Sequence, residues 1–327
     1  MGTIKTKFIV VSVIILILEI ILLSLIWISI SRKIKVLGNK VEIPLARESF
    51  TLNPTDNLQY FYEPKAYQKK GFGEDAPWLT EKPEYNINSE GIRGLEYSQE
   101  KLPETFRIMT LGDSFTFGLF VNTPSNYPSQ LEQLLNQNCH DNRQFEVINL
   151  GVPGYDIRYA AESFVRKKTY NPDLILWLLQ ANDFYTPNEL FRPKRNSYFN
   201  QIEQNKSDNL TSFQIWREAK DKALEELNNI FGQEKFIQYE TDSLYEFNKY
   251  YSGNLLVFTF PGTPNEYKSI MKKFVSSRAG IFYFDEVRNI YNLGLKFPDG
   301  HPTTEGYKII AEDLFNYLTT NKIIPCN

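Results

Sequence analysis

The stretch "TLGDSFTFG", Thr110 to Gly118, decides the fold of this chain. It follows the short apolar run "FRIM" and precedes a segment with helical spacing, so it stands where a buried strand ends. Gly-Asp-Ser at that point predicts a tight turn at the carboxyl edge of a parallel sheet, where ligands and nucleophiles lie in such folds. A turn without chemistry is the alternative, and the rest of the chain must decide whether Ser114 is a nucleophile.

From Phe106 onward, short apolar runs alternate with segments of helical spacing. Among the helical segments, "DIRYAAESFVRKK" has Asp156 as a cap, and another helix begins at Pro128. The apolar runs have the buried character of parallel strands covered on both faces. They are "FRIMTLGD", "FEVINLG", "DLILWLLQAND", "LLVFTFPG" and "GIFYFDEV". The pattern predicts an α/β fold, a three-layer doubly wound parallel sheet.

The connection between the third and fourth runs, about residues 185–253, is too long for a loop and predicts a helical insertion. Within it, "SFQIWREAKDKALEELNNIFG" predicts an amphipathic helix closed by Gly232. The apolar face expected for this helix comprises Phe213, Trp216, Ala223, Leu224, Leu227 and Ile230. The insertion is either a packed surface decoration or a lid over the candidate site. Arg192, Lys194 and Arg195 in "FRPKRN" either bind an anionic ligand there or form a solvated face.

The amino-terminal part of the chain differs from everything after it. Residues 8–30, "FIVVSVIILILEIILLSLIWISI", are apolar enough for a membrane-spanning helix, whose length would be roughly 34 Å. The run is too long for a signal peptide and lacks a cleavage site, so we expect a retained anchor after a tail of residues 1–7. Residues 31–104 read as a tether plus a small irregular subregion ahead of a domain at 105–327. Flanking positive charges leave the orientation open.

Composition excludes several classes of protein. With 42% hydrophobic residues in 327, the chain can bury a sizeable core. Its net charge of −3, without a long basic run, gives no footprint for a nucleic-acid partner. Cys139 and Cys326 form no CxxC pair or Cys/His cluster, which argues against a structural zinc site, and a bridge between them stays open. We expect no cofactor and no metal.

The two histidines of the chain bear on Ser114, because a serine nucleophile needs a base, which is nearly always histidine. His140 lies in the polar stretch "NCHDNRQ", which reads as a solvent loop. His301 lies in "FPDGHPTTEGY", a turn that leads into the last helix, beside Asp299. A doubly wound sheet brings all loops at its carboxyl edge together, so His301 is the candidate base for Ser114.

Acyl transfer also needs hydrogen-bond donors for an oxyanion. After the second run, "NLGVPGY" offers the amide of Gly151, which lacks a Cβ and lets backbone approach closely. After the third run, "QAND" offers the side-chain amide of Asn182. Each has a plainer reading, as a turn glycine and as a helix cap.

Taken together, these four blocks resemble the SGNH hydrolases, also called the GDSL esterase/lipase family. "GDSFTFG", "NLGVPGY", "QAND" and "DGHP" are similar to the family's Ser, Gly, Asn and His blocks and follow in the family's order. The resemblance implies that Ser114 is the nucleophile and His301 the base. It also implies an oxyanion hole of the Ser114 and Gly151 amides with the Asn182 side chain, on a three-layer α/β sheet.

The chain departs from the family pattern in two places. Gln180 stands where the third block commonly has glycine, which is expected to change the loop but keep Asn182. The family's acidic partner usually precedes the histidine by three residues, where this chain has Pro298. Asp299 stands only two before His301, and we expect its side chain to reach the near ring nitrogen poorly, so its role as third catalytic residue is left open.

The anchor, the segment "INSEGIRGLEY" at residues 87–97 and the insertion resemble membrane-anchored bacterial members, which act on the envelope side, often on acylated glycans. The resemblance implies a single-pass membrane protein with an extracytoplasmic domain. Its activity would be that of a serine esterase, which removes acetyl or other acyl groups from an envelope carbohydrate or lipid through an acyl-serine intermediate. The alternatives are an O-acyltransferase that modifies an envelope glycan, and a non-catalytic anchored binding or assembly protein.

Overall fold

The computed structural model describes residues 58–140, 142–205 and 210–326. The predicted tail at 1–7 and span at 8–30 lie outside the described residues. Among the helices that are described, none combines the length and apolar character needed to cross a membrane.

A parallel sheet is the centre of the described chain, as predicted. Its five strands run in the order β2-β1-β3-β4-β5, and every neighbouring pair is parallel. Each predicted apolar run supplies one strand: β1 Thr105–Leu111, β2 Gln144–Asn149, β3 Leu174–Leu178, β4 Asn254–Phe258 and β5 Ile281–Phe284. The chain leaves β1 toward one side and β3 toward the other, so the switch point of the topology lies between these two strands.

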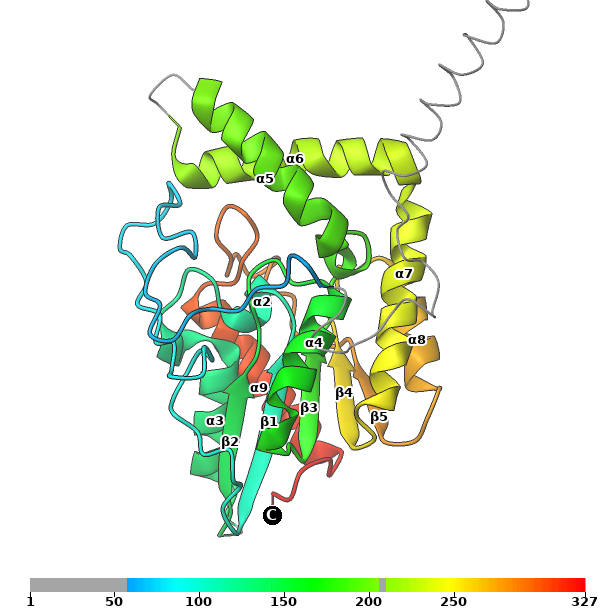
Figure 1. The fold of residues 1–327 in the computed structure, drawn as a ribbon. Helices are drawn as coiled ribbons and strands as arrows, with labels where there is room; N and C mark the ends of the chain where they lie inside the picture. Colours follow the sequence, from blue (N-terminus) through cyan, green and yellow to red (C-terminus); the bar gives the residue numbers. More distant parts are fainter. Residues whose placement is uncertain (1–57, 141, 206–209, 327) are drawn as a thin grey trace, which may run out of the picture. The chain divides into compact units, whose positions relative to one another are not determined.

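Helices cover both faces of the sheet and complete three layers (Figure 1). Helices α3 (Tyr127–Asn138) and α9 (Thr304–Thr320) pack together on one face. Helices α4 (Ile157–Lys167) and α7 (Gln233–Glu246) pack together on the other, with α8 (Asn265–Val275) beside α7. The doubly wound α/β prediction is confirmed.

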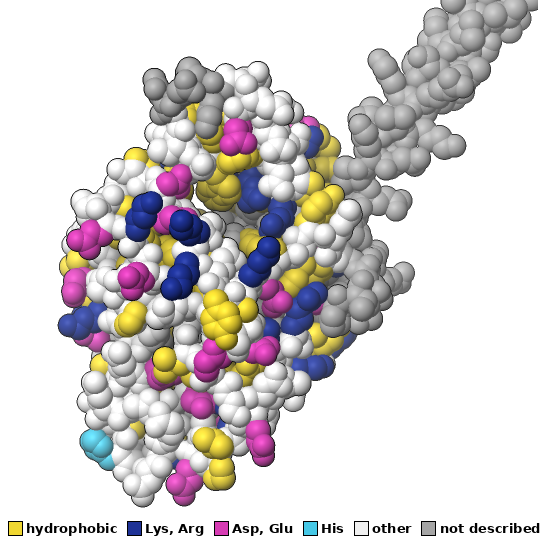
Figure 2. All heavy atoms as spheres, turned by 60° about the vertical axis from the view of Figure 1, so that its left-hand side comes forward, with side chains coloured by type: hydrophobic (Ala, Val, Ile, Leu, Met, Phe, Trp, Pro, Cys, Tyr) yellow, Lys and Arg dark blue, Asp and Glu magenta, His cyan; other side chains and the backbone are white. Residues whose placement is uncertain are grey.

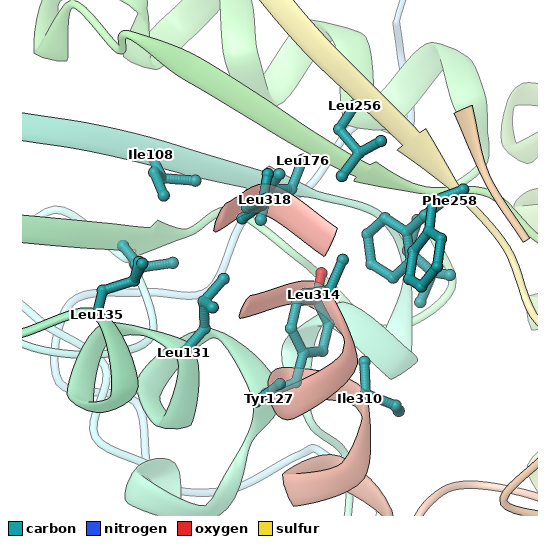
Figure 3. Close-up of a cluster of buried hydrophobic side chains, with 14 of the residues drawn as sticks. Ile108, Tyr127, Leu131, Leu135, Leu176, Leu256, Phe258, Ile310, Leu314 and Leu318 are labelled. Atoms are coloured by element: carbon teal, nitrogen blue, oxygen red, sulfur yellow. The ribbon is translucent and has the colours of Figure 1, made fainter. Parts of the chain in front are cut away.

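The core between the sheet and the α3/α9 layer is built from aliphatic side chains that alternate along the strands (Figure 3). Ile108, Leu176 and Leu256 point from three strands toward this layer and are fully buried. Side chains one turn apart on the two helices pack against them: Leu131 and Leu135 of α3, and Ile310, Leu314 and Leu318 of α9. Burial of one such side chain contributes about 1.5–3 kcal/mol.

Local signals place the helix starts as expected. The Asp156 carboxylate accepts a hydrogen bond from the Tyr159 amide (2.7 Å) and so caps α4. In α3, Pro128 occupies the first turn, where its missing N–H costs nothing, and Asn126 caps the helix through the Ser129 amide (2.8 Å).

The insertion between β3 and β4 is helical. After the short turn η4 (Ala181–Phe184) come α5 (Asn188–Asn205), α6 (Ser212–Phe231), α7 and the turn η5 (Phe247–Lys249). Gly232 ends α6, as predicted. The predicted apolar face of α6 is partly wrong, because its buried stripe repeats every four residues and comprises Ile215, Ala219, Ala223 and Leu227. Ile230 is 57% exposed, and Phe213 and Trp216 are half-buried on a neighbouring side.

Residues 58–104 carry no long helix or strand, yet they pack into the domain. The buried Arg93 side chain donates hydrogen bonds to the carbonyls of Phe117 and Gly118 (2.6 Å each) and Val121 (2.7 Å). Its guanidinium also lies over the rings of Phe117 and Tyr85. This segment therefore braces the chain that follows β1, through the short helices α2 (Ser114–Phe117) and η2 (Thr123–Ser125).

A disulfide joins Cys139, which caps the carboxyl end of α3, to Cys326 beyond α9. The sequence left this pairing open. The bond ties together the two helices that cover one face of the sheet. The turn η3 (Lys168–Tyr170) completes the described elements by linking α4 to β3.

Candidate active site

Ser114 begins helix α2 at the point where β1 ends, so it lies at the carboxyl edge of the sheet and at the switch point. Asp113 caps this helix, because its carboxylate accepts from the Phe115 amide (2.9 Å). The Ser114 side chain is half-buried. The predicted turn after "FRIM" is therefore a strand-to-helix turn that presents one hydroxyl.

His301 and Asp299 meet Ser114 from the loop before α9. The Ser114 Oγ lies 2.7 Å from His301 Nε2, and His301 Nδ1 lies 2.8 Å from Asp299 Oδ2. Because a carboxylate only accepts, the ring proton belongs on Nδ1, and Nε2 is then free to accept from the serine hydroxyl. The three side chains form one hydrogen-bonded chain, although Ser114 and His301 are 187 residues apart.

The expectation that Asp299 reaches the imidazole poorly is wrong. The chain folds back on itself here, with a bridge between Lys296 and Pro302 and a hydrogen bond from the Phe297 amide to the His301 carbonyl (2.7 Å). Asp299 stands in the bend, so its Oδ1 accepts from the His301 amide (3.2 Å) while Oδ2 accepts from the ring. The tight bend removes the one-residue difference in spacing.

Two aromatic rings hold the imidazole from the sides. The centre of the Phe115 ring lies 4.6 Å from the centre of the His301 ring, with the two rings tilted. The Phe120 ring packs edge-on against the imidazole, with 5.2 Å between the ring centres. The His301 side chain is 14% exposed and that of Asp299 is 10% exposed. The imidazole is thus fixed in orientation and mostly shielded from water, which strengthens its bond to the carboxylate.

Asn182 comes to the same edge of the sheet on η4. Its Nδ2 donates to Asp113 Oδ2 and to Asp183 Oδ1, both at 3.2 Å. Gln180, the departure from the family pattern, donates through Nε2 to Asp113 Oδ1 (3.4 Å). The third block is therefore tied to the residue before the nucleophile. To donate to an oxyanion, Asn182 must give up one of its two long bonds.

Gly151 does not present a free amide, contrary to expectation. Its N–H donates to Asn149 Oδ1 (2.9 Å), and the Asn149 side chain donates in turn to the Thr116 carbonyl (2.9 Å). A Cβ on Gly151 would lie 2.4 Å from the Phe117 nitrogen, so glycine is needed for close packing behind α2.

The second glycine of "NLGVPGY", Gly154, is a further donor candidate that the sequence analysis did not single out. Gly154 is exposed, has φ of +80°, and its N–H has no acceptor within the described part of the chain. Its carbonyl accepts from the Asn188 side chain (2.7 Å), which fixes the turn. A glycine following a proline was the available sequence signal for a turn of this kind, since glycine adopts positive φ more readily than other residues do.

Buried carboxyls lie behind the site. Burial, followed by the charge of neighbouring Asp113, raises the pKa of Asp183 well above its usual range. Burial raises the pKa of Asp156 to about 6 against the opposing hydrogen bonds from Asn188 and Tyr159, and also raises that of Glu240. None of these groups touches the Ser114 hydroxyl, so they bear on stability and pH response.

The remaining sequence candidates lie elsewhere. His140 is exposed in the loop between α3 and β2. Within the described residues, no group of three or more His, Cys, Asp or Glu side chains is arranged to hold a metal ion. The geometry that remains is a hydroxyl hydrogen-bonded to an imidazole that a carboxylate orients. That constellation can activate a serine for attack on a carbonyl carbon.

Residues 110–309 match the family model described as the GDSL-like lipase/acylhydrolase family. No curated protein sequence shows significant similarity to the chain. Among solved structures, the chain resembles the psychrotrophic esterase EstA from Pseudoalteromonas sp., with 12% identity, a TM-score of 0.43, and coverage of 67% of this chain and 99% of that one. It also resembles a family two carbohydrate esterase from Clostridium thermocellum, with 12% identity, a TM-score of 0.38, and coverage of 70% and 68%.

Proposed function

We propose that this protein, which belongs to the GDSL-like lipase/acylhydrolase family and is a serine ester hydrolase, removes acyl groups from an envelope carbohydrate or lipid. Acetyl is the acyl group that we expect first. The observation that carries the proposal is the unbroken hydrogen-bonded chain from Ser114 through His301 to Asp299. In it Ser114 attacks the ester carbonyl and His301 takes the serine proton. His301 then returns that proton to the leaving alcohol, and water resolves the acyl-serine.

Oxyanion stabilisation falls to donors at the same edge of the sheet. The Ser114 amide is at the start of α2, where helix N–H groups are unsatisfied. The Asn182 side chain supplies a second donor after exchanging one of its carboxylate bonds. In this proposal Gly154 is the third donor in place of Gly151, because its N–H has no acceptor among the described residues whereas that of Gly151 donates to Asn149.

Residues 8–30 anchor the protein in a membrane in this proposal, with the catalytic domain outside the cytoplasm. The Cys139–Cys326 disulfide supports that placement, because such bonds persist in oxidising compartments and are rare in the cytosol. Protease added to cells opened only at the outer envelope should digest the domain. Protection until the inner membrane is lysed would reverse the placement.

The catalytic proposal is tested with an activated acetate ester and a serine-directed phosphonate. The full-length protein should hydrolyse the ester and take up one label, and Ser114→Ala should do neither while keeping its melting temperature. Unchanged labelling of that variant would disprove the assignment of the nucleophile. Adding glycan acceptors separates a hydrolase, which releases free acetate, from an acyltransferase, which forms a new ester.

A further inference from the structure

Helices α5 and α6 lie over the carboxyl ends of the strands, where the candidate site is (Figure 1). Phe213 of α6 contacts the rings of Trp78 (5.0 Å) and Phe120 (6.0 Å). Phe120 in turn contacts the ring of His301 (5.2 Å). The side of α6 that carries Phe213 is therefore one aromatic layer away from the catalytic imidazole, so the insertion is a cover of the site.

Three cations line this cover. Arg192 and Arg195 lie one turn apart on α5, and Lys220 lies on α6. The Arg192 guanidinium lies 3.6 Å from the centre of the Tyr62 ring. Arg195 and Lys220 both approach the Trp216 ring, at 5.8 and 5.7 Å. In Figure 2, Lys and Arg side chains border a hollow in the upper part of the molecule.

One end of the row of cations lies near the turn that holds Gly154, and the other end lies near the loop that holds Asp299. At one end, the Tyr62 hydroxyl donates to the Pro153 carbonyl, next to Gly154. At the other end, the Lys220 ammonium is within electrostatic range of the carboxylates of Asp113 and Asp299, as well as of Asp221 on its own helix. A group bound along the row would thus lie beside the scissile ester.

None of the three cations has a carboxylate within 4 Å in the described part of the chain. Each lies near an aromatic ring, and Arg195 also donates a hydrogen bond to Asn196 Oδ1 (2.8 Å). Neighbouring lysines on the same helices behave differently, since Lys194 pairs with Glu226 (2.7 Å) and Lys222 with Glu218 (2.8 Å). All three cations are half-buried. Burial lowers the pKa of both Arg195 and Lys220. Their positive charges are therefore partly removed from water, and nearby negative charges do not fully offset that cost.

We propose that Arg192, Arg195 and Lys220 bind an anionic group on the alcohol part of the ester, so that the preferred substrate is an acylated sugar or polyol that carries a carboxylate, phosphate or sulfate. The inference rests on the proposed function of the same site. A guanidinium matches the planar or tetrahedral oxygens of such groups, and a partly desolvated cation gains more from an anion than an exposed one does. Lys194 on the same helix differs from them, because its charge is already paired with Glu226.

Hydrolysis kinetics on the full-length protein test this specificity. The probes are a monoacetylated methyl glucuronoside, acetylated glycerol 3-phosphate and a monoacetylated methyl glucoside, which separate carboxylate, phosphate and neutral substrates. We expect at least a tenfold higher kcat/KM for one or both anionic esters, mainly through KM. Arg195→Gln and Lys220→Gln should each lower that preference about tenfold, the worth of one charged hydrogen bond. The matched control Lys222→Gln should leave it unchanged.

Direct binding keeps the inference separate from the proposed function. Titration calorimetry of Ser114→Ala with methyl glucuronoside, glycerol 3-phosphate and methyl glucoside needs no turnover. Anion binding that Arg195→Gln or Lys220→Gln weakens and Arg195→Lys or Lys220→Arg restores supports the site, even if no ester is hydrolysed. Equal binding of neutral and anionic ligands, or anion binding untouched by both glutamine variants, overturns it.

Discussion

Replacing Asp299 by asparagine tests whether the carboxylate that contacts the His301 ring contributes to catalysis. The substitution keeps the shape of the side chain and removes its charge. If the new amide turns its oxygen to the His301 ring, its nitrogen faces the His301 N–H, which has now lost its acceptor (3.2 Å). If it turns the other way, it favours the tautomer with the proton on Nε2, which cannot accept from Ser114.

The magnitude follows from the charge that develops during catalysis. An imidazolium forms when His301 takes the serine proton, 2.8 Å from the carboxylate oxygen. Unit charges with centres about 4 Å apart interact by about 4 kcal/mol at an effective dielectric constant of about 20. That energy corresponds to about 10³ in rate, so Asp299→Asn should lower kcat by about this factor.

Steady-state hydrolysis of one activated acetate ester measures the effect. KM should change little, because Asp299 touches the histidine rather than the substrate. His301→Ala should be at least as impaired, and Asp75→Asn, at an exposed carboxylate, should match the unaltered protein. If Asp299→Asn keeps activity within tenfold of the unaltered protein, the hydrogen bond exists but the carboxylate charge does not serve catalysis.

Three further outcomes are expected. Asn182→Ala should lower kcat by about 10² to 10³, as loss of one oxyanion donor does; normal kcat would assign Asn182 to packing. Replacing Cys139 and Cys326 by serine opens a loop with a sequence separation of 187 residues and should lower the free energy of unfolding in urea by about 3–5 kcal/mol; an unchanged midpoint would contradict this. Asp156, with a pKa raised from 3.8 to about 6, should make that free energy fall by about 3 kcal/mol as pH rises from about 4 to 6, since its ionised form is disfavoured in the fold. Asp156→Asn should shrink that slope, and an identical slope would refute the assignment.

Signals that act over a few residues were sufficient for the sheet. Each apolar run contains a strand, because apolar side chains on both faces of the sheet are buried. Asp156 and Pro128 marked helix starts through their own hydrogen-bonding chemistry. The order of the four blocks also placed Ser114 and His301 together, since parallel strands end at a common edge.

Features that depend on residues far apart in the sequence could not be predicted from local patterns. The contacts of Arg93 with the carbonyls after α2 have no periodicity that could announce them. The reach of Asp299 depends on the bend around Gly300, and the use of the Gly151 amide depends on one side chain, Asn149. The helix α6 was located correctly. Which of its side chains are buried depends on how α5 packs against it, and the local sequence of α6 does not reveal that packing.

The bond between Cys139 and Cys326 has a consequence for a nicked enzyme. A single cut within the insertion would divide the polypeptide into one piece with Ser114 and another with His301. The disulfide would keep the two pieces as a single covalent molecule, and the paired faces of α3 and α9 would keep them in register. Such a clipped protein would migrate as one band until a thiol was added, and its hydrolytic activity would become sensitive to reductant.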